Sequence, residues 1–228
     1  MLAIEQLDVA YGQSKIIQNF DFSARRGEIV AILGRNGMGK TTLMRALMGM
    51  VGAAGRIALD GIDVAGLKSH QRVRRGLALV PQGRMIFSTM SVKENIETGL
   101  TASGKKTVDP DIYGLFPVLQ TMRNRKGGNL SGGQQQQLAI ARALATEPKV
   151  LLLDEPTEGI QPSIIREMAR TLRHIRDQRD LTIVVSEQVL SFALDLADRI
   201  VVMERGSIVL DEPRSQVDHD RVAAFLAV

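Results

Sequence analysis

A glycine-rich segment, "GRNGMGKTT", carries residue types that can hold a chain of phosphates. It matches the pattern G-x-x-x-x-G-K-[ST], which ends here on Gly39, Lys40 and Thr41. Glycines let backbone N–H groups wrap a β-phosphate, Lys40 reaches the β- and γ-phosphates, and the Thr41 hydroxyl can ligate Mg²⁺. A strand-like segment precedes the pattern and a helical one follows, which disfavours a merely structural turn. The remaining residues expected to contact the phosphates are Gly34, Arg35, Asn36, Gly37, Met38 and Thr42.

Two acids follow a run of apolar residues in "VLLLDE". The apolar run predicts a buried strand with Asp154 at its end, where a carboxylate can hold Mg²⁺ directly or through water. Glu155 comes next and is placed to polarise the attacking water as a general base. Two solvated acids at a strand end are the alternative, which the nearby phosphate loop makes less attractive.

Gln82 and Tyr11 extend this chemistry, each with a plain alternative. Gln82 ends another predicted strand, and its amide can ligate Mg²⁺ or orient water; an ordinary surface glutamine is the alternative. Tyr11 lies in the N-terminal strand region, where an aromatic ring can stack on adenine or simply pack in the core. The sequence leaves both alternatives open for Tyr11.

The segment "NLSGGQQQQLAIARAL" predicts an amphipathic helix that begins with an anion site. Ser131 is a good N-cap, whereas Gly132 and Gly133 cost roughly 1 kcal/mol each inside a helix relative to alanine. These glycines leave the first backbone N–H groups uncovered, and such a helix end attracts anions.

The segments around these residues alternate between strand and helix. Strands are predicted in "LAIEQLDVAY", "KIIQNFDFSA", "EIVAIL", around "RIALDGIDV", and in "LALVP", "KVLLLD" and "LTIVVS". Helices are predicted over 40–50, 66–76 and 163–179, and the chain closes with a hairpin, "RIVVMERGSIVLD", and a short helix. Residues 83–147 are mostly helical, broken at "TASGKKTVDPD" and "RNRKGGN". We therefore expect one α/β domain over 1–228, with a parallel-sheet core from 1–82 and 148–228 and an inserted helical subdomain over 83–147.

Composition excludes several classes of protein. Lys and Arg total 29 against 25 Asp and Glu, so the net charge of +4 does not indicate a nucleic-acid binder. The basic clusters at 72–75 and 123–126 have no aromatic residues between them, so base stacking is not expected. The absence of cysteine suits a reducing compartment, and the early Glu5 and Asp8 do not fit a signal peptide. No apolar run approaches the ~20 residues of a membrane span.

Together these segments resemble an ATPase subunit of an ABC transporter, over the whole chain. Residues 34–42 resemble the Walker A loop, Gln82 the Q-loop, "VLLLDE" Walker B and Tyr11 the adenine-stacking residue. "LSGGQ" resembles the family signature, which consists of Leu130, Ser131, Gly132, Gly133 and Gln134. The resemblance implies a P-loop NTPase (RecA-like) core with an N-terminal antiparallel β subdomain and an inserted helical subdomain.

The resemblance also implies cofactors and partners. The cofactors are ATP and Mg²⁺, and the signature of one subunit faces the γ-phosphate of ATP bound to the other. The expected partners are two permease subunits, a second related ATPase or a second copy of this chain, and a periplasmic binding protein reached through the permease. The chain would lie peripherally on the cytoplasmic face of the inner membrane, with no nucleic-acid partner.

Two departures from the common pattern narrow the branch of the family. Gln188 stands where most such ATPases have a histidine against the γ-phosphate, and Gln161 replaces the usual aspartate after Walker B. Both resemble the smaller ATPase of importers for branched-chain amino acids, urea and short amides, and the motif phrases look closest to the urea importer. The main expectation is therefore a urea importer, with a branched-chain amino acid or short-amide importer as the alternative. The three histidines fall elsewhere and are expected on polar surfaces.

Other classes remain as competing hypotheses. A soluble ABC ATPase of DNA repair would carry long coiled coils before the signature, and no sustained heptads occur there. A nucleotide-gated structural protein without hydrolysis is disfavoured because Glu155 is present. Near Gln82 we expect an apolar cleft that receives a permease helix, with Met85, Ile86, Phe87 and Met90 exposed. The alternative is that these residues pack the helical subdomain against the core.

Overall fold

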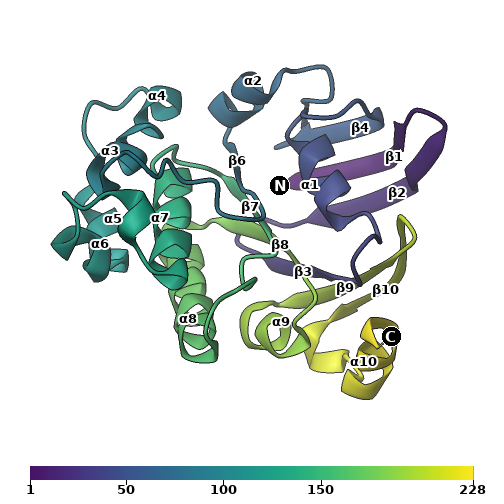
Figure 1. The fold of residues 1–228 in the computed structure, drawn as a ribbon. Coiled ribbons are helices and arrows are strands. Elements are labelled where there is room, and N and C mark those ends of the chain that lie inside the picture. The colour runs from purple at the N-terminus through teal and green to yellow at the C-terminus, as the bar shows by residue number, and fades with distance from the viewer. Residues whose placement is uncertain (228) are drawn as a thin grey trace.

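The computed structural model describes residues 1–227, which form a six-stranded sheet, a smaller four-stranded sheet and the helices that cover them (Figure 1). The larger sheet has the order β10-β9-β3-β8-β7-β6, and every pairing in it is parallel except β10 with β9. Its strands are β3 (Ile29–Leu33), β6 (Leu77–Val80), β7 (Val150–Asp154), β8 (Thr182–Glu187), β9 (Arg199–Glu204) and β10 (Ser207–Pro213). The expected parallel core is present.

The four-stranded sheet is antiparallel, in the order β2-β1-β4-β5. Its strands are β1 (Leu2–Tyr11), β2 (Ser14–Ala24), β4 (Ala54–Leu59) and β5 (Ile62–Asp63). Alternating residues such as Leu2, Ile4 and Phe20 point inward and pack on helix α1 (Lys40–Leu47). The other side of α1 packs on Val30 and Ile32 of β3, so this helix lies between the two sheets.

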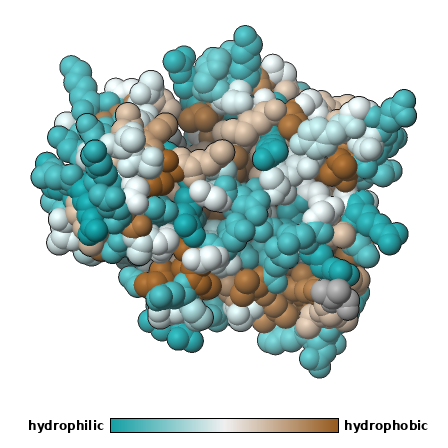
Figure 2. All heavy atoms as spheres, in the orientation of Figure 1, coloured by the Kyte–Doolittle hydropathy of each residue, from teal (hydrophilic) through white to brown (hydrophobic). Residues whose placement is uncertain are grey.

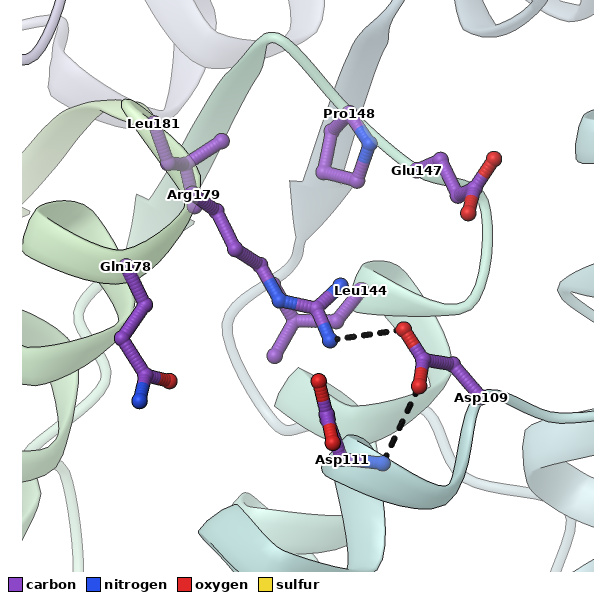
Figure 3. Close-up of a pocket in the computed structure, with 8 residues that line it drawn as sticks. All are labelled: Asp109, Asp111, Leu144, Glu147, Pro148, Gln178, Arg179 and Leu181. Atoms are coloured by element: carbon purple, nitrogen blue, oxygen red, sulfur yellow. Dashed lines mark hydrogen bonds and ion pairs between the residues drawn. The ribbon is translucent and has the colours of Figure 1, made fainter.

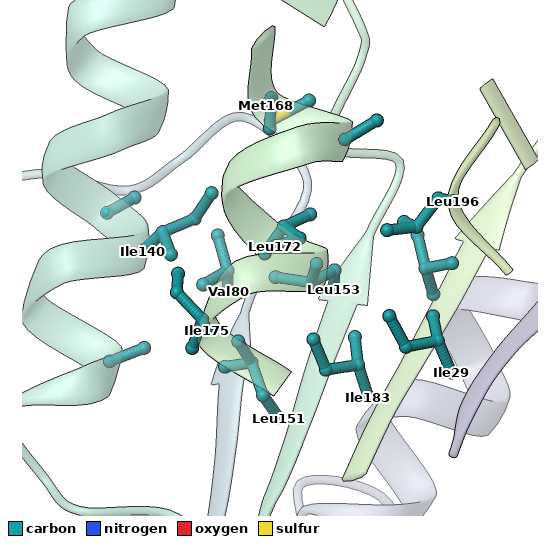
Figure 4. Packing of buried hydrophobic residues seen from close by; sticks show 14 of the residues in the cluster. Ile29, Val80, Ile140, Leu151, Leu153, Met168, Leu172, Ile175, Ile183 and Leu196 are labelled. Carbon is teal, nitrogen blue, oxygen red and sulfur yellow. The ribbon is translucent and has the colours of Figure 1, made fainter. Parts of the chain in front are cut away.

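The opposite face of the six-stranded sheet packs against a layer of three helices. Because strand residues alternate between faces, Ile29, Leu151 and Ile183 point away from α1 and toward this helical layer (Figure 4). The layer consists of α7 (Gly132–Leu144), α8 (Pro162–Arg179) and α9 (Leu190–Leu196). On α8 the buried residues Met168, Leu172 and Ile175 recur at helical spacing, which explains why this segment forms an amphipathic helix.

The remaining helices are short, and several begin at recognisable caps. Ser91 and Glu94 form a capping box at α3, Asp109 caps α5, and Asp218 caps α10. These elements are α2 (Ser69–Arg74), α3 (Val92–Glu97), α4 (Leu100–Ser103), α5 (Pro110–Leu115), α6 (Pro117–Thr121), η1 (Gly127–Asn129), η2 (Arg214–Gln216) and α10 (His219–Leu226). Among the described residues, no helix combines the length and apolar character needed to cross a bilayer.

Most predicted elements form, with three differences. The segment "TASGKKTVDPD" was expected to break the helical region, yet its first residues form the last turn of α4. The helix expected over 66–76 is limited to α2, because Gly66 and Gly76 flank it. Helix α9 was not expected at all. Helices α3 to α7 lie together beside the sheet in Figure 1, and the subdomain boundaries at 83 and 147 stay a prediction.

Candidate active site

The predicted phosphate and acid residues follow neighbouring strands of the six-stranded sheet. Strand β3 leads into the phosphate loop, β7 ends at Asp154 and β8 ends at Glu187. In the parallel register Asp154 is paired with Ser186, and Leu33 with Glu187. Since the carboxyl ends of parallel strands meet at one edge, the fold brings these groups together there, as is general for ligand sites in such sheets.

Backbone geometry explains two glycines of the phosphate loop. Gly39 is the N-cap of α1 with φ +105°, a left-handed conformation that suits glycine. A Cβ at Gly34 would lie 2.5 Å from the carbonyl oxygen of Met203, so only glycine fits there. The first turn of α1 carries no acidic residue and no side-chain cap, and its N–H groups therefore suit an anion.

Lys40 begins α1 and is folded over this loop. Its ammonium group is 2.7 Å from the carbonyl oxygen of Gly34, 3.0 Å from that of Arg35 and 3.1 Å from Oε1 of Glu155. The side chain is only 3% exposed, so its charge depends on these three acceptors. Phosphate oxygens entering the loop can replace them, and the cradle therefore fits a bound polyphosphate.

Thr41 and Asp154 form a pair suited to one small cation. The Thr41 hydroxyl is 3.2 Å from Oδ1 of Asp154, and the Ser186 hydroxyl donates to the same oxygen at 2.5 Å. Within residues 1–227 no cluster of three or more His, Cys, Asp or Glu side chains could hold a metal alone. One hydroxyl and one carboxylate fit Mg²⁺, which usually takes its other ligands from water and substrate phosphates.

Three predicted residues converge on the Glu155 carboxylate. Oε2 of Glu155 is 3.2 Å from Nε2 of Gln188 and 3.4 Å from Nε2 of Gln82, while Oε1 pairs with Lys40. The backbone of Glu155 has φ +46°, a conformation that costs energy for a residue other than glycine. Such strain is typical of functional sites, where surrounding contacts must enforce it.

Sequence reasoning missed two residues of this edge, Ser186 and Glu187. Glu187 is 2% exposed, and its carboxylate accepts from the backbone N–H of Thr157 at 3.0 Å and of Gln188 at 2.9 Å. It therefore fixes the turn that presents Gln188, whose Nε2 also donates to Oδ1 of Asn36 at 2.8 Å. The available signal was that the apolar segment "LTIVVS" ends in a serine and is followed directly by a glutamate.

Tyr11 and the signature lie outside this network. Tyr11 ends β1 with 47% exposure, so the core alternative is wrong for this residue. Ser131 caps α7 by accepting from the N–H of Gln134, whose side chain accepts in return from the N–H of Ser131. In the part of the chain described here, no hydrogen bond joins the signature to the phosphate loop. All three histidines are exposed, as expected.

A separate pocket of about 550 Å³ lies between α5 and α8 (Figure 3). Some of its polar groups bind one another: Arg179 pairs with Asp109 at 3.2 Å, and the N–H of Asp111 donates to the same carboxylate. None of the predicted phosphate-binding or catalytic residues lines this pocket. It is therefore not part of the candidate active site.

Burial raises the pKa of the Asp154 carboxyl, against the opposing hydrogen bonds from Ser186 and Thr41. With the folded pKa above the unfolded one, this group favours folding most at acidic pH and loses that contribution as the pH rises through its folded pKa. We predict that Asp154→Asn raises the unfolding free energy of the metal-free protein at neutral pH by about 1 kcal/mol, or about 2–4 °C in melting temperature. Scanning calorimetry in a chelating buffer measures this.

The gain should shrink as the pH falls, because protonated Asp154 no longer carries the buried charge that asparagine removes. Asparagine can still accept both hydroxyls at the position of Oδ1, so these hydrogen bonds are kept. A gain that is independent of pH, or a loss of stability at neutral pH, would contradict the assigned cause. Glu158→Gln is a matched control, since Glu158 is exposed in the following loop.

Comparison with known proteins places this geometry in a family. The model of the family described as "ABC transporter" matches residues 17–158, more than half of the chain. The chain belongs to the ABC transporter family. This ABC ATPase accordingly binds ATP, and Mg²⁺ is required for hydrolysis. The predicted enzyme class and cofactors are thereby confirmed.

Solved structures confirm the fold of this ABC ATPase. An ATP-binding cassette of an ABC transporter matches with a TM-score of 0.85 and 24% identity, covering 100% of this chain and 99% of that one. A dimeric cassette in a post-hydrolysis state, bound to ADP and Pi, matches with a TM-score of 0.84 and 23% identity over 94% and 99% of the two chains. The P-loop NTPase core, antiparallel β subdomain and helical region are those of the cassette fold.

Curated relatives of the ABC ATPase are transport subunits. The high-affinity branched-chain amino acid transport ATP-binding protein BraG of Pseudomonas aeruginosa is 38% identical over 99% of this chain and 95% of its own. The probable branched-chain amino acid transport ATP-binding protein LivF of Archaeoglobus fulgidus is 30% identical, over 97% and 96%. A sulfate/thiosulfate import ATP-binding protein, CysA of Methylococcus capsulatus, is 37% identical over 91% of this chain but 61% of its own.

Proposed function

We propose that this chain hydrolyses ATP to drive a binding-protein-dependent importer of branched-chain amino acids. The convergence of Lys40, Gln82 and Gln188 on the Glu155 carboxylate carries the hydrolytic part of the proposal. The full-length likeness to the branched-chain amino acid subunit of Pseudomonas aeruginosa supports the solute class. These relatives favour the alternative drawn from the sequence over the main expectation of urea.

Each residue of the site has a proposed task. The backbone of the phosphate loop and Lys40 hold the phosphates, Tyr11 stacks on the base, and Glu155 accepts a proton from the attacking water. Thr41, Asp154 and Gln82 would hold Mg²⁺, which neutralises charge on the transferred phosphoryl group. The amides of Gln82 and Gln188 orient the Glu155 carboxylate and the water beside it. The other proposed phosphate-loop contacts come from Gly34, Arg35, Asn36, Gly37, Met38, Gly39 and Thr42.

The signature is proposed to complete the site of a second ATPase. The first turn of α7 carries no acidic residue, so Ser131 and the N–H groups of Gly132 and Gly133 can receive an anion from another molecule. A second copy or a related ATPase can place its bound ATP there, against the residues 130–134. The complete site would then need two ATPase subunits.

Variants of Gln188 test whether the residue at this position, a histidine in most such ATPases, acts by donating a hydrogen bond. We predict that Gln188→Ala lowers turnover of the full complex about a hundredfold, which corresponds to losing one oriented donor worth ~3 kcal/mol. Gln188→His should retain most of the activity, because its ring can donate to Oε2 of Glu155 from the same strand end. Steady-state ATP hydrolysis with the partner ATPase present measures both variants. Normal turnover of the alanine variant would make Gln188 a bystander and leave hydrolysis to the partner's site.

An apolar groove of about 860 Å³ is the proposed docking surface for the permease. Its apolar lining includes Met48, Met50, Val73, Met85 and Phe87. Figure 2 shows the apolar side chains gathered in the hollow between the helices α3–α4 and α2. The groove reaches the active-site residues Thr41, Gln82 and Asp154.

The chemistry of the groove suits an amphipathic helix. Its apolar lining accepts the apolar face of such a helix, and Arg45 and Arg142 would attract an acidic residue on it. Met85, Phe87 and Met90 are exposed by 69%, 48% and 38%, in agreement with the expectation from the sequence. Ile86 was expected to be exposed as well, but it is half-buried and packs against the main core.

We predict that Phe87→Glu removes at least nine-tenths of permease-stimulated turnover while ATP affinity stays within about twofold. A buried charge in an apolar contact costs several kcal/mol, whereas the 48% exposed ring contributes little to the fold of the free subunit. ATPase assays with and without the reconstituted permease measure this. Ile62→Glu is a matched control, because Ile62 is also 48% exposed but lies in β5, away from the groove. An unfolded Phe87→Glu variant would instead favour packing of the helical part as the role of Phe87.

The proposed assembly has two permease subunits, this ATPase with a second related or identical one, and a periplasmic binding protein that acts through the permease. The chain would lie peripherally on the cytoplasmic face of the inner membrane, held there by the groove. No nucleic acid takes part in this proposal.

Transport measurements test the solute class. Proteoliposomes that contain the complete complex should accumulate labelled leucine in an ATP-dependent manner and should leave labelled urea outside. Uptake of urea without leucine would overturn the branched-chain amino acid assignment and restore the main expectation from the sequence. A complex with Glu155→Gln in this chain is the control for uptake that does not depend on hydrolysis.

A further inference from the structure

Three successive residues after Gln82 have left-handed backbones. The φ angles are 75° at Gly83, 67° at Arg84 and 45° at Met85. This conformation suits glycine, but it costs roughly 1–2 kcal/mol at each of the other two residues. Strain of this kind persists only where the surroundings enforce it, and it is often part of a functional device. The contacts of Arg84 therefore need an explanation.

The Arg84 guanidinium joins three segments of the chain. Its Nη2 donates to the carbonyl oxygen of Glu158 at 2.8 Å, and Nη1 lies 3.5 Å from Oε1 of Gln135 in α7. A Cβ added at Gly132 would lie 3.4 Å from both of these nitrogens. The guanidinium thus lies between the first turn of the signature helix and the loop that follows Glu155.

Helix α7 also donates a hydrogen bond to this segment. Nη2 of Arg142 donates to the carbonyl oxygen of Arg84 at 3.2 Å, and its guanidinium carbon lies 5.3 Å from the ring centre of Phe87. Gln135 and Arg142 are seven positions apart and so lie on one face of α7. The segment from Gln82 to Phe87 therefore contacts α7 at two points, by the hydrogen bond from Arg142 at 3.2 Å and the longer contact between Arg84 and Gln135 at 3.5 Å.

We propose that Arg84 is a positioning residue. It transmits movement of the segment 82–87, which lines the groove, to the signature helix and to the loop after Glu155. The segment that carries Arg84 has Gln82, 3.4 Å from Glu155, at one end and the groove residues Met85 and Phe87 at the other. An object seated in the groove contacts this segment, and the Arg84 bonds would pass any movement of the object to α7 and Glu158. The inference rests on the proposed function in one respect, that the permease docks in this groove.

Arg84→Ala tests the proposal through two measurements. In the isolated subunit, the backbone amides of 131–135 and 158–160 should exchange hydrogen at least tenfold faster than in the parent, while those of α1 and β8 keep their rates. In the assembled complex, permease-stimulated turnover should fall at least tenfold, with ATP affinity of the subunit unchanged. Arg84→Lys should recover only part of the turnover, because an ammonium group cannot bond to both Glu158 and Gln135 in one fixed plane.

Arg125→Ala is the matched control, since Arg125 is exposed in the bend before η1 and the change removes the same charge. Unaltered exchange in Arg84→Ala overturns the proposal. Faster hydrogen exchange together with normal permease-stimulated turnover also overturns the proposal, because Arg84 would then only stabilise the fold. If the permease fails to stimulate the unmutated subunit, the proposed function itself is contradicted. This outcome is measured on the unmutated subunit and does not depend on the Arg84 variants.

Discussion

Replacing Glu155 by glutamine should lower steady-state ATP turnover by about 10²–10⁴-fold while ATP·Mg affinity stays near that of the parent, because a lost general base typically costs that factor. The amide keeps the size of the side chain and can still bond to Gln82 and Gln188, so the phosphate loop remains in place. Lys40 keeps its two carbonyl acceptors at Gly34 and Arg35. The variant should therefore bind nucleotide and accumulate as an ATP-bound dimer.

Two measurements on the same preparation check this expectation. Release of phosphate gives turnover, and titration calorimetry with ATP·Mg gives affinity. Glu158→Gln makes the same change on an exposed side chain three positions later and should leave both values unaltered. Turnover of Glu155→Gln within about threefold of the parent, or roughly 0.7 kcal/mol in barrier, would rule out Glu155 as the base.

Lys40→Met should weaken ATP binding at least about thirtyfold, since truncating one partner of a buried charge pair costs about 2–5 kcal/mol. Methionine retains most of the apolar stem, which is buried with α1, and removes only the ammonium group. The phosphates lose their cationic partner, and the Glu155 carboxylate, 9% exposed, loses its neighbour at 3.1 Å. The effect should thus appear in the dissociation constant as well as in turnover.

The binding constant separates this prediction from a defect confined to catalysis. Calorimetric titration with ATP·Mg measures it, and Lys93→Met is the control because Lys93 is an exposed lysine that pairs with Glu97 on a helix surface. An unchanged dissociation constant in Lys40→Met would contradict the assignment of the phosphate loop. Loss of folding can be recognised by comparing the melting temperatures of the two variants.

The sequence predicted those parts of the fold that depend on local patterns. Alternating apolar residues define the strands, and the pair Ser131 and Gln134 forms a capping box because both side chains reach a backbone N–H of the first turn. The phosphate loop and the Walker B acids were found because the residues of each motif are contiguous in the sequence and therefore also adjacent in space. The α/β class follows from the same patterns, whereas the antiparallel sheet was expected from the family resemblance.

The remainder depends on contacts between distant segments. Nothing in the sequence indicates that Gln188 donates to Asn36 or that Ser186 donates to Asp154, because both contacts arise from the order of strands in the sheet. Helix α9 has no side-chain cap and only seven residues, so its local signal is weak, and it forms because Phe192 and Leu196 are buried in the core. The contacts of Arg84 with Glu158 and Gln135 likewise join segments that are distant in the sequence.

The order of strands also bears on how the protein is made. Strand β3, which leads into the phosphate loop, pairs only with β8 and β9. Ile29 is the register partner of Ile183, and Val30 that of Arg199, so both partners are synthesised about 150 residues or more after β3. Although Val30 and Ile32 can already pack on α1, synthesis must pass residue 182 before β3 can pair with a neighbouring strand, and until then the strand is available for wrong pairing. A nascent chain halted before residue 182 should therefore bind no nucleotide and should need a chaperone to stay in solution. Capture of ATP can thus report that synthesis has passed strand β8.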